Sequence, residues 1–194
     1  MRGISIFDTG GNNVIIKVKG GRNMSKTDDV VKYLIYAYEQ ISNSRFESQE
    51  LKLQKLMYFA QRESFALTGK ELFASDFEGW IHGPVLPELR YYFEQDYVPY
   101  NGDSSTLNET DKYVIESVIH KYGQYDAWYL RNLSHEERSW QKSRKGLKDS
   151  ESGNQLISKS DIRKDAEKVR IYDHQYDMYL DEFEDFTEEV YLGG

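Results

Sequence analysis

Cysteine is absent from the 194-residue chain, which excludes disulfide bonds, a thiolate nucleophile, and zinc or iron–sulfur sites built on cysteine. Proline is scarce, and its three residues all lie between positions 84 and 99, where they indicate a rigidly shaped region. No apolar run approaches the ~20 residues that a membrane span needs, and no secretory signal lies near Met1. These absences favour a soluble, cytoplasmic protein that does not contact a membrane.

Aromatic residues, in contrast, make up 14 % of the chain, with 16 Tyr, 9 Phe and 3 Trp. Hydrophobic residues reach only 39 % and the mean hydropathy is -0.75, so we expect a modest core. Disordered chains are poor in aromatics, which indicates a folded protein with a tyrosine-rich interior and surface. The length fits one domain, or one domain with an appendage.

The formal net charge of -8 is concentrated near the C-terminus. Residues 165–191 contain ten acidic side chains against Lys168 and Arg170, so the rest of the chain is neutral. Such a segment repels nucleic acid and favours a basic protein partner. The alternative is a solvated helix face that keeps the protein soluble. A short basic stripe between Arg138 and Lys148 is interspersed with acids, so it does not favour nucleic-acid binding either.

Residues 1–23 predict a β-hairpin extension followed by a glycine-rich linker. Two β-rich runs, 4–7 and 14–18, flank a cluster of turn-forming residues. Because an isolated hairpin is marginally stable in water, we expect it to dock on the rest of the chain or on another chain. The alternative is a loosely ordered extension, with Met24 as an internal start.

The fold class predicted for the rest is mainly α (α+β): a compact helical domain with one small β element. Apolar residues at three-to-four spacing predict a helix from Lys26, capped by Ser25 or Thr27, and a central helix over 48–68 that ends at Gly69. Alternation predicts a short strand at 77–81. Further helices are expected at 88–95 (opened by Pro87), 108–122 (capped by Asn108), 126–133 (capped by Asp126), 134–145 (opened by a capping box at 134–137), and from 157–161 onward. We place the domain at 24–165 and an acidic aromatic helix at 166–194.

That last helix carries a heptad-like seam of large side chains. The seam consists of Tyr172, Tyr176, Tyr179, Phe183 and Phe186. Its spacing and flanking carboxylates favour an interaction element that contacts a partner protein or a second copy of the chain. The alternative is a terminal helix packed on the core of its own domain.

No catalytic, cofactor or metal motif stands out. The four histidines form none of the metal-binding spacings, and Ser139 with Lys142 matches a Ser-x-x-Lys pattern without its companion motifs. We therefore expect no enzyme activity, no cofactor and no metal. An enzyme that uses His82, His120 or His135 is the least favoured alternative.

Two blocks of sequence nevertheless resemble a known family. The first runs from the Leu-Gln-Lys-Leu stretch at 53–56 to the Gly-Trp-Ile-His-Gly-Pro-Val-Leu-Pro stretch at 79–87, and the second is Leu-Ser-His-Glu-Glu-Arg-Ser-Trp at 133–140. Together they are similar to the SocA-like or Panacea antitoxin domain, often labelled a phage-associated GepA-like protein, and the likeness covers about 28–170. The chain departs from the family pattern at Gly79, where Ala is usual, and at Ser139, where Pro is usual.

The resemblance implies a non-catalytic module that neutralises a cognate protein toxin encoded nearby. In one branch of the family, the antitoxin also delivers its toxin to a protease. A rigid surface around Trp80, His82 and Pro84 then becomes the candidate partner-binding site, together with the C-terminal seam. Two alternatives remain open: a prophage protein that binds a host factor without a toxin, and Trp80 and Trp140 as core aromatics whose indole N–H groups find internal acceptors.

Overall fold

The computed structural model describes residues 25–47, 49–95 and 106–170. The predicted hairpin at 1–23 and the aromatic seam at 172–186 lie outside these residues. The elements are α1 (Lys26–Ser42), α2 (Glu50–Thr68), β1 (Phe77–Trp80), β2 (Gly83–Val85), the 3-10 turn η1 (Pro87–Leu89), α3 (Tyr92–Gln95), α4 (Glu109–Tyr122), α5 (Ala127–His135), α6 (Arg138–Ser143), β3 (Leu156–Ile157) and α7 (Lys159–Arg170). The predicted fold class, mainly helical with a small β element, is confirmed.

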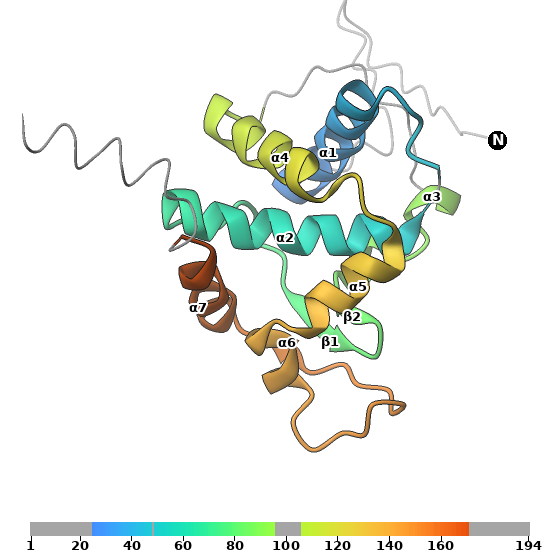
Figure 1. The fold of residues 1–194 in the computed structure, drawn as a ribbon, viewed down its shortest axis with the longest axis vertical. Helices are drawn as coiled ribbons and strands as arrows, with labels where there is room; N and C mark the ends of the chain where they lie inside the picture. The colour runs from blue at the N-terminus through green and yellow to red at the C-terminus, as the bar shows by residue number, and fades with distance from the viewer. Residues whose placement is uncertain (1–24, 48, 96–105, 171–194) are drawn as a thin grey trace, which may run out of the picture.

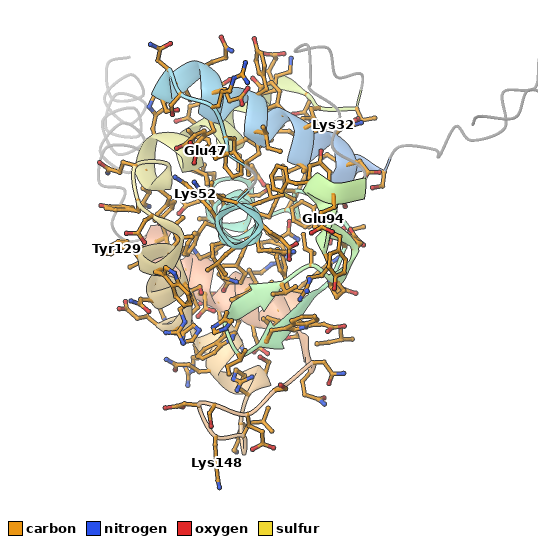
Figure 2. The ribbon with its side chains drawn as sticks, turned by 90° about the vertical axis from the view of Figure 1, so that its right-hand side faces the viewer. Lys32, Glu47, Lys52, Glu94, Tyr129 and Lys148 are labelled. Carbon is orange, nitrogen blue, oxygen red and sulfur yellow. The ribbon has the colours of Figure 1, made fainter. Side chains whose placement is uncertain are left out.

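Helix α2 is the centre of the domain, as its wide apolar face predicts. Figure 2 shows it nearly end-on, with the other elements around it. Every residue from Lys52 to Phe65 is buried. In Figure 1, α1 and α4 cover one side of α2, whereas α5, the β1–β2 hairpin and α7 cover the other. None of the helices in the described segments is long and apolar enough to cross a membrane.

Local capping signals give the correct start or end of several helices. Ser25 and Asp28 form a capping box at the start of α1, and Asn108 and Asp111 do the same for α4. Gly69 ends α2 with a φ of 67°, in the left-handed region that glycine adopts without strain. These signals are encoded within four residues of the helix end, so they can be identified from the sequence alone.

The sheet has three short antiparallel strands in the order β2-β1-β3. In β1, Glu78 faces Val85 of β2 on one side and Leu156 of β3 on the other. The sequence predicted β1 but neither of its neighbours. Strand β2 has only three residues, including a glycine and a proline, and β3 has two residues and is distant in sequence from β1.

Two predicted helices differ from the structure. The helix expected over 88–95 is broken into η1 and α3, because Tyr91 adopts a φ of 62° and donates its backbone N–H to the Glu50 carboxylate at 3.0 Å. The capping box expected at Ser134 does not form either. Ser134 lies inside α5, where its hydroxyl donates to the carbonyl of Arg131 at 2.7 Å.

Helix α6 is instead capped from a distant element. Its first backbone N–H groups, those of Arg138 and Ser139, donate to the carboxylate of Asp165 at 3.0 and 2.8 Å. Asp165 belongs to α7, which continues to Arg170, beyond the position 165 at which the sequence analysis ended the domain. Helix α7 therefore orders α6 as well as covering α2.

Candidate protein-interaction surface

Two polar side chains of α2 hold the β1–β2 hairpin and the residues that follow it. The amide of Gln54 donates to the carbonyl of Leu86 at 3.1 Å and accepts the backbone N–H of Leu86 at 2.7 Å. The amine of Lys55 donates to the carbonyl of Pro84 at 2.7 Å. The Leu-Gln-Lys-Leu and Gly-Pro-Val stretches, about thirty residues apart, are thus one contact, because these hydrogen bonds satisfy backbone groups that the short strand leaves unpaired.

Gly83 allows this contact to be close. Its φ is 97°, and a Cβ at this position would lie 2.4 Å from the Ser134 hydroxyl and 2.9 Å from Cε of Lys55. The hairpin therefore packs directly against both α2 and α5. This packing fixes the position of the hairpin tip, residues 81–82, relative to the two helices.

The second sequence block, residues 133–140, packs against the β1–β2 hairpin. The indole N–H of Trp140 donates to the carbonyl of Trp80 at 2.9 Å, and the ring of His135 stacks on Trp140 at 3.7 Å. The indole N–H of Trp80 itself donates to the Glu78 carboxylate at 2.7 Å. Both indole N–H groups thus have internal acceptors, and Trp140 acts as a support for the hairpin.

The two departures from the family pattern match their surroundings. A Cβ at Gly79 would lie only 2.0 Å from the hydroxyl oxygen of Ser143, so α6 occupies the space that alanine would need. Ser139 uses its backbone N–H to bind Asp165 and its hydroxyl to bind Tyr58 at 2.8 Å. A proline at position 139 would remove that N–H donor.

A buried ion pair joins the second block to α2. The guanidinium of Arg62 hydrogen-bonds the Glu137 carboxylate and also pairs with Glu63 at 2.9 Å. Burial raises the pKa of Glu137, although the Arg62 charge opposes this shift. This ion pair holds the α5–α6 junction against α2. The motif residues of both blocks therefore mainly fix the positions of α2, the hairpin, α5 and α6 relative to one another, and we call this arrangement the frame.

The frame leaves an open pocket of about 370 Å³ beside the hairpin tip, which we call the hairpin groove. It is lined by residues of α2, the hairpin, α5 and the chain after η1: Glu50, Leu51, Gln54, Trp80, Ile81, His82, Val85, Arg90 and Trp128. The Arg90 guanidinium lies 5.2 Å from the Trp80 ring, and the His82 ring meets the Trp128 ring edge-on at 5.5 Å. The groove is therefore an aromatic cleft with polar groups at its rim.

The predicted partner-binding residues have different positions in this surface. Trp80 is partly buried and His82 is exposed, and both line the groove. Pro84 is buried, so it shapes the hairpin and offers no contact area. The five seam residues, Tyr172, Tyr176, Tyr179, Phe183 and Phe186, lie outside the described residues and stay a prediction.

The sequence analysis missed Trp128, the second residue of α5, whose exposed fraction is 59 %. Its neighbour Tyr129 is exposed as well and projects from the outer side of α5 (Figure 2), where it stacks on Tyr125 at 4.4 Å. The sequence does contain a signal for this exposure. Three aromatic residues lie close to Asp126, the N-cap of a helix that is too short to bury all of them. Aromatic side chains left exposed together are unusual on a soluble surface and indicate an interaction site.

The histidines considered for an enzyme do not form a metal site in the described residues. His82, His120 and His135 lie on three different elements, and no group of three or more metal-ligating side chains occurs in the described segments. Burial, with help from the nearby Arg131 and Lys55 charges, lowers the pKa of His135 to about 4, so it is a weak base. The two side chains of the Ser-x-x-Lys pattern have different partners. The Ser139 hydroxyl hydrogen-bonds that of Tyr58, whereas the Lys142 amine pairs with Asp161 at 2.7 Å.

Comparison with known proteins agrees with the resemblance inferred from sequence. Residues 53–141 match the family model described as "Antitoxin SocA-like, Panacea domain". No curated protein and no solved structure matches the chain. The matched region runs from α2 to α6 and includes most of the residues that line the hairpin groove, whereas α1 and α7 lie outside it but pack on the same core. Residues 53–141 are therefore similar to the SocA-like Panacea antitoxin domain, and this similarity agrees with the two sequence blocks that the structure brings together.

Proposed function

We propose that this protein is a non-catalytic antitoxin that neutralises a toxin encoded beside its own gene, and that it binds the toxin through the hairpin groove. The observation that carries the proposal is the exposed Trp128, whose ring contacts that of His82 beside an aromatic cleft. The family match supports an antitoxin-like role for the domain.

The construction of the groove suits protein binding. Its walls are held by the bonds from Gln54 and Lys55, and by the indole N–H of Trp140. A surface that is already ordered loses little conformational entropy when a partner binds. Tryptophan and histidine have only two side-chain torsions, so they bury much area at low entropic cost.

The groove residues offer little support for an enzyme. A general base needs a pKa near the working pH and a second group within hydrogen-bond reach. The ring of His82 contacts the Trp128 ring, and no hydrogen bond joins His82 to an acid in the described residues. These contacts support binding rather than turnover.

Co-expression with the neighbouring reading frames tests the proposal. The wild-type chain should restore growth to cells that express the toxin and should co-purify with it. The double variant Trp128→Ala/His82→Ala should lose both properties while keeping the melting temperature of the wild type. Tyr113→Ala is the matched control, because Tyr113 is 58 % exposed but lies on α4, on the opposite side of α2 (Figure 1).

Two results would contradict the proposal. If no neighbouring product is toxic, yet the chain captures a host protein, the protein binds a host factor and is not an antitoxin. If the double variant rescues growth as well as Tyr113→Ala does, toxin binding uses a different surface.

A further inference from the structure

Helix α6 contacts both α7 and β1, the strand that supplies Trp80 to the hairpin groove (Figure 1). It has only six residues, and its N-cap residue, Glu137, makes no side-chain capping bond. A helix of this length is not stable by itself, because its first turn fixes several residues for a single hydrogen bond. The position of α6 therefore depends on contacts from other elements.

The N-terminus of α6 is held by Asp165 of α7. Each oxygen of this carboxylate accepts one backbone N–H, that of Arg138 at 3.0 Å and that of Ser139 at 2.8 Å. The Asp165 side chain has no exposed surface, so water cannot replace it as the acceptor. A second contact between the two helices, the ion pair of Lys142 with Asp161, lies at the surface, where such pairs add little stability.

Trp140, Ser143 and the C-cap residue Arg144 connect α6 to β1. The indole N–H of Trp140 donates to the carbonyl of Trp80 at 2.9 Å, and the guanidinium of Arg144 donates to the carbonyl of Gly79 at 3.3 Å. The Ser143 hydroxyl packs so closely on Gly79 that a Cβ there would lie 2.0 Å from its oxygen. These contacts hold the wall of the groove that contains Trp80 against α6.

We propose that Asp165 is a positioning residue for the hairpin groove: it caps α6 from α7, and α6 in turn holds Trp80 in the groove wall. The two links form one continuous chain of buried or half-buried contacts from α7 to the groove. Helix α7 lies outside residues 53–141, which match the family model, so the groove depends on a part of the chain that the match does not include.

The consequence for binding rests on the proposed function. When α7 is docked, the Trp80 wall is ordered before the toxin arrives. When the Asp165 cap is lost, the toxin must order this wall itself, and that entropic cost weakens binding. Toxin binding and the docking of α7 are therefore coupled.

Hydrogen exchange in the full-length protein, without any partner, tests the positioning role. The indole N–H of Trp140 reports its bond to Trp80, and the buried backbone amides of α2 report global stability. Asp165→Asn keeps the size of the side chain but replaces one acceptor oxygen by an NH2 group, so one N–H of α6 loses its acceptor. Asp28→Asn is the matched control, because Asp28 also accepts a backbone N–H at a helix N-terminus but lies on α1, on the other side of α2.

In Asp165→Asn, exchange of the Trp140 indole N–H should become roughly tenfold faster relative to the amides of α2, as expected when a capping hydrogen bond is lost. Asp28→Asn should leave this ratio unchanged. An equal acceleration at Trp140 and in α2 would overturn the proposal, because Asp165 would then support the whole fold and not the groove wall. An unchanged rate at Trp140 would overturn it as well.

Titration with the toxin tests the consequence for binding. Asp165→Asn should weaken binding several-fold, and Trp140→Phe, which keeps an aromatic ring but removes the N–H donor, should do the same. The double variant should bind no more weakly than the weaker of the two single variants, because both changes break the same chain of contacts. Fully additive losses would contradict the proposal.

The two experiments separate this inference from the proposed function. If exchange at Trp140 responds as expected but the Trp128→Ala/His82→Ala variant still rescues growth, the toxin does not use the groove, and Asp165 keeps its positioning role. If exchange at Trp140 does not respond, the positioning role is refuted and the proposed function still stands.

Discussion

Gln54 and Leu86 form a reciprocal pair, in which one side-chain amide satisfies both the N–H and the C=O of one buried backbone unit. Gln61, two helical turns further along α2, does the same for a second segment by accepting the N–H of Leu72 and donating to the carbonyl of Phe73. Two glutamines on one helix therefore anchor both ends of the extended chain between α2 and η1. The position of the hairpin groove depends on these anchors.

Gln54→Glu should lower the free energy of unfolding by about 1–3 kcal/mol, because an ionised carboxylate cannot donate to the Leu86 carbonyl and leaves it buried without a partner. Urea denaturation at pH 8 measures the change. The matched control is Gln124→Glu at an exposed position, which should change stability by less than about 0.5 kcal/mol. Equal effects of the two changes would show that the Gln54 contact does not hold the hairpin.

Gly83→Ala should destabilise the fold through two separate costs, a strained left-handed backbone and a clash with Ser134. Gly146→Ala is the control for the first cost alone, since Gly146 has a similar φ of 93° against 97° but no atom within 4 Å of the position that an alanine methyl group would take. The backbone cost is about 1–3 kcal/mol at either site. Thermal melting should therefore show a larger loss for Gly83→Ala, and similar losses would mean that the hairpin is not tightly packed on α5.

Glu137→Gln should remove about 3–5 kcal/mol of stability, because it breaks a buried ion pair and leaves the Arg62 charge only partly compensated by Glu63. The neighbouring Glu136 is exposed, so Glu136→Gln is the matched control and should be near neutral. Chemical denaturation of both variants measures the difference. A loss below about 1 kcal/mol for Glu137→Gln would show that the α5–α6 junction is not tied to α2 by this pair.

Lys55 should make stability depend on pH in the alkaline range. Burial, followed by the Arg131 charge, lowers its pKa from 10.5 to about 7 in the folded chain. Between these two values, the unfolded chain holds a proton that the folded chain lacks, so stability rises with pH across the window and falls as the pH is lowered towards 7. The slope contributed by one such group is at most about 1.4 kcal/mol per pH unit.

Lys55→Met should remove that contribution, and unfolding free energies measured from pH 7 to 10 will detect it. The quantity to compare is the difference in unfolding free energy between the variant and the wild type at each pH, because tyrosines and other lysines titrate in the same range. Lys145→Met, at an exposed position, should keep the wild-type slope. If Lys55→Met also keeps it, the Lys55 amine retains an ordinary pKa in the folded protein.

The sequence predicted those parts of the fold that are encoded locally. Ser25, Asn108 and Gly69 mark helix ends through contacts within four residues, and the apolar face of α2 is wide enough to place it at the centre. The capping box at Ser134 failed because a distant residue, Asp165, caps α6 instead. Strand β3 was missed because two residues leave no periodicity to detect.

The candidate site was predictable only in part, for a related reason. Trp80 and His82 could be identified because they lie in a continuous sequence block with an unusual composition. Trp128 comes from a separate element, and its exposure depends on how α5 packs on α2 and β2, which no local pattern shows. Pro84 looks like a surface residue in the sequence, yet its carbonyl is bound by the buried Lys55.

A calorimetric titration with the toxin identified by growth rescue will show whether the hairpin groove is the toxin-binding surface. Trp128→Ala should weaken binding by about 2 kcal/mol or more, roughly 30-fold, as expected for an aromatic side chain at the centre of an interface. Tyr113→Ala should leave the dissociation constant within about threefold of the wild type. An unchanged dissociation constant for Trp128→Ala, or an equal loss for both variants, would contradict the claim.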